Sequence, residues 1–263
     1  MEDDDRGPPL RAAAASRVGL WEVRYEGTRS RTDPSDALLI KLYCTQLLHA
    51  LGRRVHLRQQ AMSTAVVLFR RFCWQQSVFD RDLVLCSITS LWAASKVEEC
   101  AVSPKVLVWE LCELGEVSYE VQELVYAEFL LLSELHFDIL VCHPHRPLAH
   151  LLQHVSAAAS LAPDKRERLA GTAWYLLNDC FRTDACLCHP PVAIALACLH
   201  TAGKLLGVST YCWFPRPPLE EQRHIQQTAN AIVVLYEQCA ELEPWESTAA
   251  QEARRRRERD MGL

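Results

Sequence analysis

The segment VLCSITSLWAASK, residues 84–96, has a second version in the chain, VAIALACLHTAGK, at residues 192–204. Both segments are apolar along almost their whole length, and both end in two small residues and a lysine. The copies lie 108 positions apart, which is far longer than the repeat of a helical solenoid. The sequence therefore predicts two copies of one small helical domain. We expect the function to lie where the copies differ.

Prolines divide most of the chain into long intervals with helical periodicity. In the first copy we expect a helix that opens at residues 33–36, then helices over 57–72 and 82–98, one from Ser103, and one over 117–138. In the second copy we expect helices over 148–156, 164–179 and 192–206, a short turn at 219–222 and a helix over 223–242. Because the run 82–98 is apolar on most sides, it predicts a central helix surrounded by others.

A proline-rich break, HPHRP at residues 143–147, predicts the linker between the copies. We divide the chain into an N-terminal segment (1–35), a first repeat (36–145), a second repeat (146–243) and a basic tail (244–263). The first segment lacks periodicity, and the tail contains Arg254–Arg257 and Arg259. Such an arginine cluster is usually solvated surface, and it can act as a nuclear address.

The composition describes an ordinary globular chain of 263 residues, 49% hydrophobic and 23% charged. The net charge of −5 argues against direct binding of nucleic acid, which usually requires a basic surplus. The start, MEDDDRGPPL, lacks the positive region of a signal peptide, and no apolar run is long enough for a membrane span. We expect a soluble intracellular protein without a membrane partner.

Twelve cysteines are scattered through apolar stretches, for example Cys44, Cys86, Cys198 and Cys239. This pattern predicts small buried thiols rather than a disulfide framework. The nearest approach to a metal site is CLCH at residues 186–189, but no second pair of ligands follows at zinc-finger spacing. We therefore expect no metal.

The common catalytic and phosphate-binding motifs are absent from the sequence, including GxGxxG, GxxxxGK[ST], HExxH and GxSxG. We expect no catalytic residues and no cofactor. More informative is the acidic and basic pattern around Lys96, which is followed by two glutamates, while Glu128 interrupts a later apolar stretch. At the offset of 108, Lys204 is the counterpart of Lys96, but Tyr236 is the counterpart of Glu128. The lysine–glutamate combination in the first copy alone favours a single binding surface.

Five stretches make the chain recognisable. They are ALGRRVHLRQQAMSTAVVLFRRFCW (50–74), ASKVEE (94–99), AEFLLLSELHFDILVCHPHRPL (127–148), AWYLLNDCFRTDACLCHPPVAIALACLH (173–200) and VVLYEQ (233–238). The chain resembles the cyclins, and among them the cyclin C group, the regulatory subunits of the Mediator-associated cyclin-dependent kinase. The resemblance covers residues 36–242 or so. It implies an all-α fold of two tandem five-helix cyclin boxes, with flexible or weakly ordered termini.

The resemblance also implies a mechanism. In the cyclins, the lysine of the KVEE motif and the glutamate of the fifth helix, here Lys96 and Glu128, form hydrogen bonds to the kinase beside its mobile αC helix. Glu99, the last residue of KVEE, belongs to the same expected surface. Docking moves the kinase helix inward so that its glutamate can pair with the lysine that positions ATP. The cyclin itself performs no chemistry.

Cyclin C-like proteins share a groove between the boxes, and the matching residues are Trp174, Asn178, Asp179 and Tyr236. The resemblance implies that this groove binds other subunits of the Mediator kinase module. The alternative is that Trp174 and Tyr236 are ordinary core rings. Helical spacing puts Trp174 and Asn178 on one face, so they can share a surface.

Two arginines place the chain among the transcriptional cyclins. Arg58 matches the cyclin-box arginine, whereas Arg70 stands where cell-cycle cyclins have the aspartate that pairs with it. The sequence LRQQA at 57–61 also departs from the substrate-docking motif of cell-cycle cyclins.

Three kinds of function remain open. The leading hypothesis is a nuclear kinase-activating subunit that regulates transcription by RNA polymerase II, of the cyclin C type or of another transcriptional type such as cyclin H, K or T. The second is a DNA-binding use of the fold, as in IIB-like transcription factors. The third is a bare helical scaffold or a thiol-rich metal protein.

Overall fold

The computed structural model describes residues 34–75, 82–115, 119–158, 161–210, 213–214 and 217–238. Every regular element in these ranges is a helix, so the predicted all-α class is confirmed. Within the same ranges, no helix is long and apolar enough to cross a membrane. The N-terminal segment before residue 34 and the basic tail lie outside the described residues.

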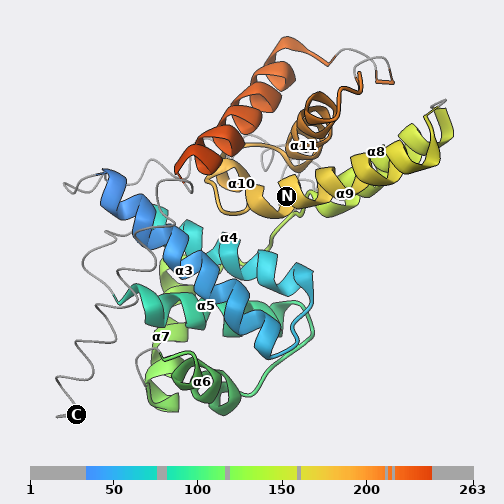
Figure 1. Ribbon diagram of the computed structural model, residues 1–263. Coiled ribbons are helices and arrows are strands. Elements are labelled where there is room, and N and C mark those ends of the chain that lie inside the picture. The colour runs from blue at the N-terminus through green and yellow to red at the C-terminus, as the bar shows by residue number, and fades with distance from the viewer. Residues whose placement is uncertain are drawn as a thin grey trace, which may run out of the picture.

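The first repeat is built around α5 (Leu83–Val97), the helix that contains the first copy of the duplicated segment. Its neighbours are α3 (Pro34–Arg54), α4 (Gln59–Gln75), α6 (Pro104–Glu113) and α7 (Val121–Glu134). All four pack against α5, as Figure 1 shows. The prediction of a central, surrounded helix is therefore confirmed.

The second repeat is built in the same way around α11 (Pro191–Leu205). It contains α8 (His145–Ala158), α9 (Pro163–Cys180), the short α10 (Ala185–Cys188) and a helix over residues 219–238. The bounds of α5 and α11 differ by 108 residues at both ends. The duplication seen in the sequence is thus a duplication of structure.

Most helix boundaries lie within three residues of those predicted, and the differences at α7, at α8 and after residue 222 have structural consequences. α7 begins at Val121 and ends at Glu134, because the backbone at His136 and Phe137 is left-handed and cannot continue the helix. α8 begins at His145, so half of the predicted linker is helical; a proline in the first helical turn breaks no intrahelical hydrogen bond. The predicted break after residue 222 is absent, since residues 219–238 form one helix. The short α10 was not predicted.

Two consecutive arginines of α4 hold segments that lie far along the chain. The side chain of Arg70 is 1% exposed, and it pairs with Asp184 beside α10 at 2.6 Å and donates to the carbonyl oxygen of Arg182. Arg71 donates to the carbonyl oxygens of Asp138 and Leu140, at 2.8 and 3.1 Å. The first arginine therefore holds the second repeat, and the second holds the chain that leaves α7 at the end of the first repeat.

Substitution of Asp184 by alanine should leave the guanidinium of Arg70 buried without a carboxylate. We expect a loss of about 3 kcal/mol in the free energy of unfolding, measured by urea denaturation. Glu110→Ala, which removes the acid from the more exposed Arg54–Glu110 pair, is the control and should cost about 1 kcal/mol or less. Equal losses in the two variants would contradict the role assigned to Arg70.

Candidate functional site

The end of α5 and the middle of α7 meet at an ion pair between Lys96 and Glu128. The side chain of Lys96 is 41% exposed and that of Glu128 is 14% exposed. The ammonium of Lys96 also lies 3.7 Å from the ring centroid of Trp92, one helical turn earlier. The structure thus brings together two residues that lie 32 positions apart in the sequence.

This pair is suited to binding more than to stability. Ion pairs that water reaches contribute about 1 kcal/mol or less to folding. The ammonium of Lys96 carries three N–H donors, and the carboxylate of Glu128 has two acceptor oxygens, so each group can serve a partner as well as the other. The pair can therefore present one donor group and one acceptor group in a fixed arrangement.

Large apolar side chains are exposed next to this pair. Val125 and Phe129, which are 48% and 66% exposed, lie four residues apart on one side of α7. Phe137 and Leu140, both 65% exposed, follow on the chain that leaves α7. Exposed apolar groups of this size mark interaction surfaces when they gather on one side of a protein. The sequence analysis missed these residues, because α7 is apolar around most of its circumference.

The backbone at His136 and Phe137 closes the end of α7. The φ angle of Phe137 is 58°, and that of His136 is 51°, so two successive residues with side chains adopt the left-handed conformation. This conformation is unfavourable for a bulky residue and persists where the surrounding structure requires it. Here it holds an aromatic ring out into solvent rather than in the core.

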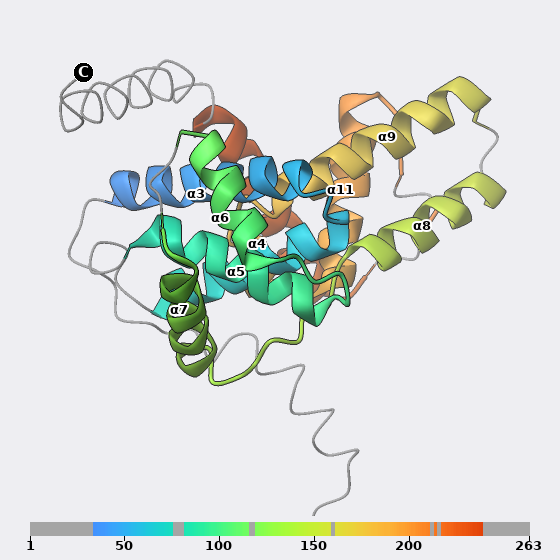
Figure 2. The ribbon, with the colours of Figure 1, turned by 90° about the horizontal axis from the view of Figure 1, so that it is seen from below.

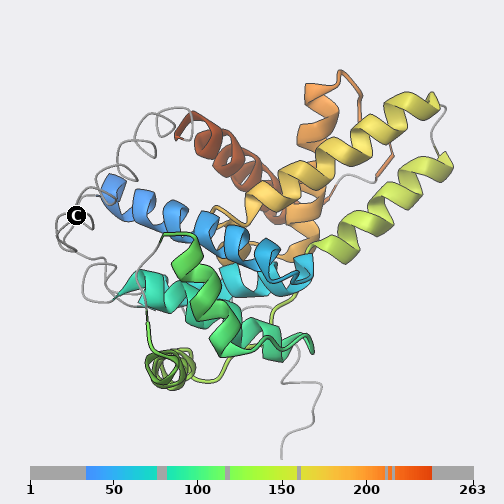
Figure 3. The same ribbon diagram turned by 60° about the horizontal axis from the view of Figure 1, so that its bottom comes forward.

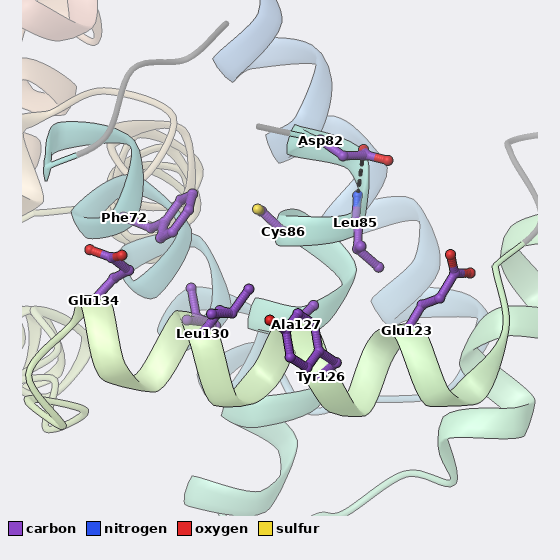
Figure 4. A pocket seen from close by; sticks show the side chains of 10 residues that line it. Phe72, Asp82, Leu85, Cys86, Glu123, Tyr126, Ala127, Leu130 and Glu134 are labelled. Carbon is purple, nitrogen blue, oxygen red and sulfur yellow. Dashed lines mark hydrogen bonds between the residues drawn. The ribbon is translucent and has the colours of Figure 1, made fainter. Parts of the chain in front are cut away.

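The other flank of α7 is also apolar. A cavity of about 270 Å³ lies between α4, α5 and α7, and Figure 4 shows Tyr126, Ala127 and Leu130 of α7 pointing into it. Phe72 and Cys86 line it from α4 and α5. Carboxylates stand around this cavity, from Asp82, Glu123 and Glu134. Both sides of α7 therefore present surface that a partner can contact.

The two glutamates that follow Lys96 have different environments. Glu98 turns inward and accepts hydrogen bonds from Gln60 and Thr64, both at 2.6 Å, while His143 of the linker lies 3.7 Å away. Glu99 is exposed, with a φ of 55°, and it forms no ion pair with any residue that the structure describes. Glu99 is thus free to meet a partner beside Lys96, whereas Glu98 ties α4 to the linker.

The two arginines singled out in the sequence also differ. Arg58 is exposed at the start of α4. Arg70 is buried and finds its carboxylate in the second repeat, at Asp184, rather than within the first. The sequence could show that Arg70 replaces an acid, but it could not show which acid would balance the charge.

Three of the four predicted groove residues lie on α9, and Tyr236 lies on the helix over 219–238, the dark red helix of Figure 3. The hydroxyl of Tyr236 donates to Asp179 at 2.7 Å, and Gln59 of α4 donates to Asn178 at 3.3 Å. Burial and the hydrogen bond to Asp179 raise the pKa of Tyr236. Contacts within the chain therefore already order Asn178, Asp179 and Tyr236. The partner of Asn178, Gln59, belongs to the opposite repeat.

Trp174 is less exposed than predicted. Its ring stacks on His145 with a centroid distance of 5.9 Å and an interplanar angle of 25°, and it packs against the core. The neighbouring Tyr175 is 73% exposed and is the aromatic ring that α9 offers to solvent. The sequence analysis did not single out Tyr175. Because Tyr175 follows the core-facing Trp174 by one residue, its side chain is expected on a different side of the helix.

The pKa of His145 is strongly lowered. Burial, and second the neighbouring His143, lower the pKa of His145 to about 4, while Asn178 opposes the change. His145 is therefore neutral at physiological pH and packs between Trp174 and Phe181 as an uncharged ring.

The CLCH segment is packed into the second repeat. Cys186 is buried, and Nδ1 of His189 lies 2.9 Å from Nδ1 of His224. Among the residues that the structure describes, no group of three or more His, Cys, Asp or Glu side chains could hold a metal ion. None of the ten cysteines in the described ranges forms a disulfide.

We expect the free energy of unfolding to fall in acid, because the buried His145 resists protonation. The unfolded chain takes up a proton near pH 6.5, whereas the folded chain resists it until about pH 4, so the contribution is complete above pH 6.5 and declines as the pH falls. We expect His145→Gln to reduce the drop in melting temperature between neutral pH and about pH 5. His150→Gln, at an exposed site of the same helix, should leave the drop unchanged. An unaltered pH dependence in His145→Gln would refute this assignment.

Two family models match this chain, one for each repeat. A model of the cyclin N-terminal domain matches residues 36–140, and a model of the cyclin C-terminal domain matches residues 143–243. Cyclin-C of Rattus norvegicus is 33% identical over 210 residues, which cover 76% of this chain and 72% of that protein.

Two solved structures show the same arrangement of helices. A chain of the CAK complex of Chaetomium thermophilum, bound to ATP-gamma-S, gives a TM-score of 0.66 at 20% identity and covers 95% of this chain and 86% of its own. A chain of the yeast RNA Pol II CTD kinase CTDK-1 complex gives a TM-score of 0.61 at 19% identity, over 78% and 67% of the two chains. At these identities the similarity concerns the fold.

Proposed function

Because this chain belongs to the cyclin family, we propose that it is the regulatory subunit of a cyclin-dependent kinase, the one associated with Mediator. In this proposal it acts in the nucleus and regulates transcription by RNA polymerase II. Its similarity to Cyclin-C supports the choice of the Mediator-associated kinase over those of other transcriptional cyclins. The chain contributes binding, and the kinase performs the phosphoryl transfer.

One observation supports this proposal most: the Lys96–Glu128 pair occurs in the first repeat alone, beside the exposed Phe129. In the second repeat the counterparts of the pair are Lys204 and Tyr236. A half-exposed ion pair and an exposed ring next to it combine a polar anchor with apolar contact area, as in the centres of protein interfaces.

The mechanism is a shift in the kinase's conformational equilibrium. A subunit that binds the active arrangement of the kinase αC helix more tightly than the inactive one stabilises the active state by the difference in binding free energy. Lys96 and Glu128 would fix the position of that helix through hydrogen bonds, and the apolar groups around α7 would supply most of the affinity. No catalytic residue of this chain is needed.

The double variant Lys96→Ala with Glu128→Ala tests the docking surface. We expect association with the kinase to fall about a hundredfold, since two charge-assisted hydrogen bonds are lost, while helix content stays unchanged. The matched control, Arg54→Ala with Glu110→Ala, removes another ion pair from the same repeat and should retain the kinase. Both effects are measured by pull-down of the kinase and by circular dichroism. Retention of the kinase by a folded Lys96/Glu128 variant would contradict the proposal.

We propose a second role for the groove residues Trp174, Asn178, Asp179 and Tyr236, in binding other subunits of the Mediator kinase module. The contact from Gln59 to Asn178 supports this role, because it makes the surface depend on both repeats at once. The exposed Tyr175 adds an aromatic anchor beside it.

The groove should separate from the kinase surface in binding assays. We expect Asp179→Ala to retain the kinase and to weaken co-purification of the remaining kinase-module subunits, because the Tyr236 hydroxyl loses its acceptor. Leu219→Ala, at a site that is 77% exposed, is the control and should change neither. Simultaneous loss of the kinase would show that Asp179 supports the fold instead.

A further inference from the structure

Lys204, the lysine of the second duplicated segment, has no acidic partner among the residues that the structure describes. Lys204 ends α11 as Lys96 ends α5, but the counterpart of Glu128 is Tyr236, whose hydroxyl binds Asp179. Lys204 is exposed, and it forms no ion pair with any residue in the described ranges. The second repeat thus has the lysine of the pair, Lys204, but a tyrosine in place of the glutamate.

Two more cations lie at the same end of this repeat, where α9 runs alongside α11 (Figure 2). A cavity of about 200 Å³ is lined by Lys165 and Arg168 of α9 and by Leu205 at the end of α11. A second cavity of about 290 Å³ is lined by Lys204 and by the residues that follow α11. Val208 borders both cavities, so the hollow of Lys165 and Arg168 adjoins the hollow of Lys204.

The three cations of this surface form no ion pair within the described part of the chain. Neither Lys165 nor Arg168 forms an ion pair there, and the acids of the same helix, Asp164 and Glu167, form none with them. Burial lowers the pKa of His200, and the nearby positive charge of Lys204 lowers it further. Three like charges around these adjoining hollows repel each other, and an anionic ligand would relieve that repulsion.

We propose that Lys165, Arg168 and Lys204 bind a phosphorylated segment of a partner protein. A phosphoserine carries a charge of about −1.5 to −2 and three acceptor oxygens, which matches several N–H donors around a small hollow. Leu205 is 66% exposed at the same place and offers an apolar contact to a residue beside the phosphate. The overall charge of −5 disfavours nucleic acid as the ligand. This site goes beyond the proposed kinase function and does not depend on it.

Fluorescence anisotropy of the full chain with a labelled peptide, Ala-Leu-phosphoSer-Leu-Ala, tests the proposal. We expect the phosphopeptide to bind at least about tenfold more tightly than its unphosphorylated form. The triple variant Lys165→Ala, Arg168→Ala, Lys204→Ala should lose that preference. The control removes the same charge from exposed sites elsewhere, by Lys105→Ala, Arg146→Ala and Arg223→Ala, and should keep it.

Three results would overturn the proposal. They are equal binding of the two peptides, equal loss in both triple variants, and displacement of the phosphopeptide by a short duplex DNA, which would indicate a nucleic-acid surface. Circular dichroism of both variants checks that they fold. Kinase pull-down distinguishes this site from the docking surface, because the Lys165/Arg168/Lys204 variant should retain the kinase even if the peptide result fails.

Discussion

The buried contact of Arg70 with Asp184 fixes how the two repeats sit relative to each other. A guanidinium that is 99% withdrawn from water is unfavourable by several kcal/mol unless a carboxylate and further acceptors surround it. Those acceptors come from the second repeat, so the repeats must dock for the charge of Arg70 to be balanced. Arg71 holds the end of the first repeat through the backbone carbonyls of Asp138 and Leu140. The contact of Gln59 with Asn178 joins the same two repeats at a second place.

The two repeats share a scaffold and differ in their charges. Around α5, the lysine at the helix end meets Glu128, and exposed apolar side chains of α7 lie next to the pair. Around α11, the equivalent lysine forms no ion pair with a described residue, and the residue at the position of Glu128 is a tyrosine that binds Asp179. Duplication of the backbone thus supplies three distinct surfaces: one with a paired cation, one between the repeats, and one whose cations form no ion pair within the described ranges.

The sequence predicts the fold well because its strongest signals are local. The run 84–96 is apolar on most sides, which predicts a helix covered by others, and its repetition at 192–204 predicts a second domain. The family resemblance predicts the site residues Lys96 and Glu128, and the structure places them in contact. Other features depend on distant contacts. The acid that balances Arg70 comes from residue 184, and the exposure of Phe137 follows from a left-handed backbone that no periodicity reveals. Trp174 is shielded by His145, which the sequence placed in a linker.

Hydrogen–deuterium exchange of the full chain, alone and with the Mediator-associated kinase, tests whether the kinase docks on the first repeat. We expect slower exchange at the end of α5, along α7 and in residues 135–140 when the kinase is bound, with α9 and α11 unchanged. Protection confined to the second repeat would contradict the assignment of the kinase to the first.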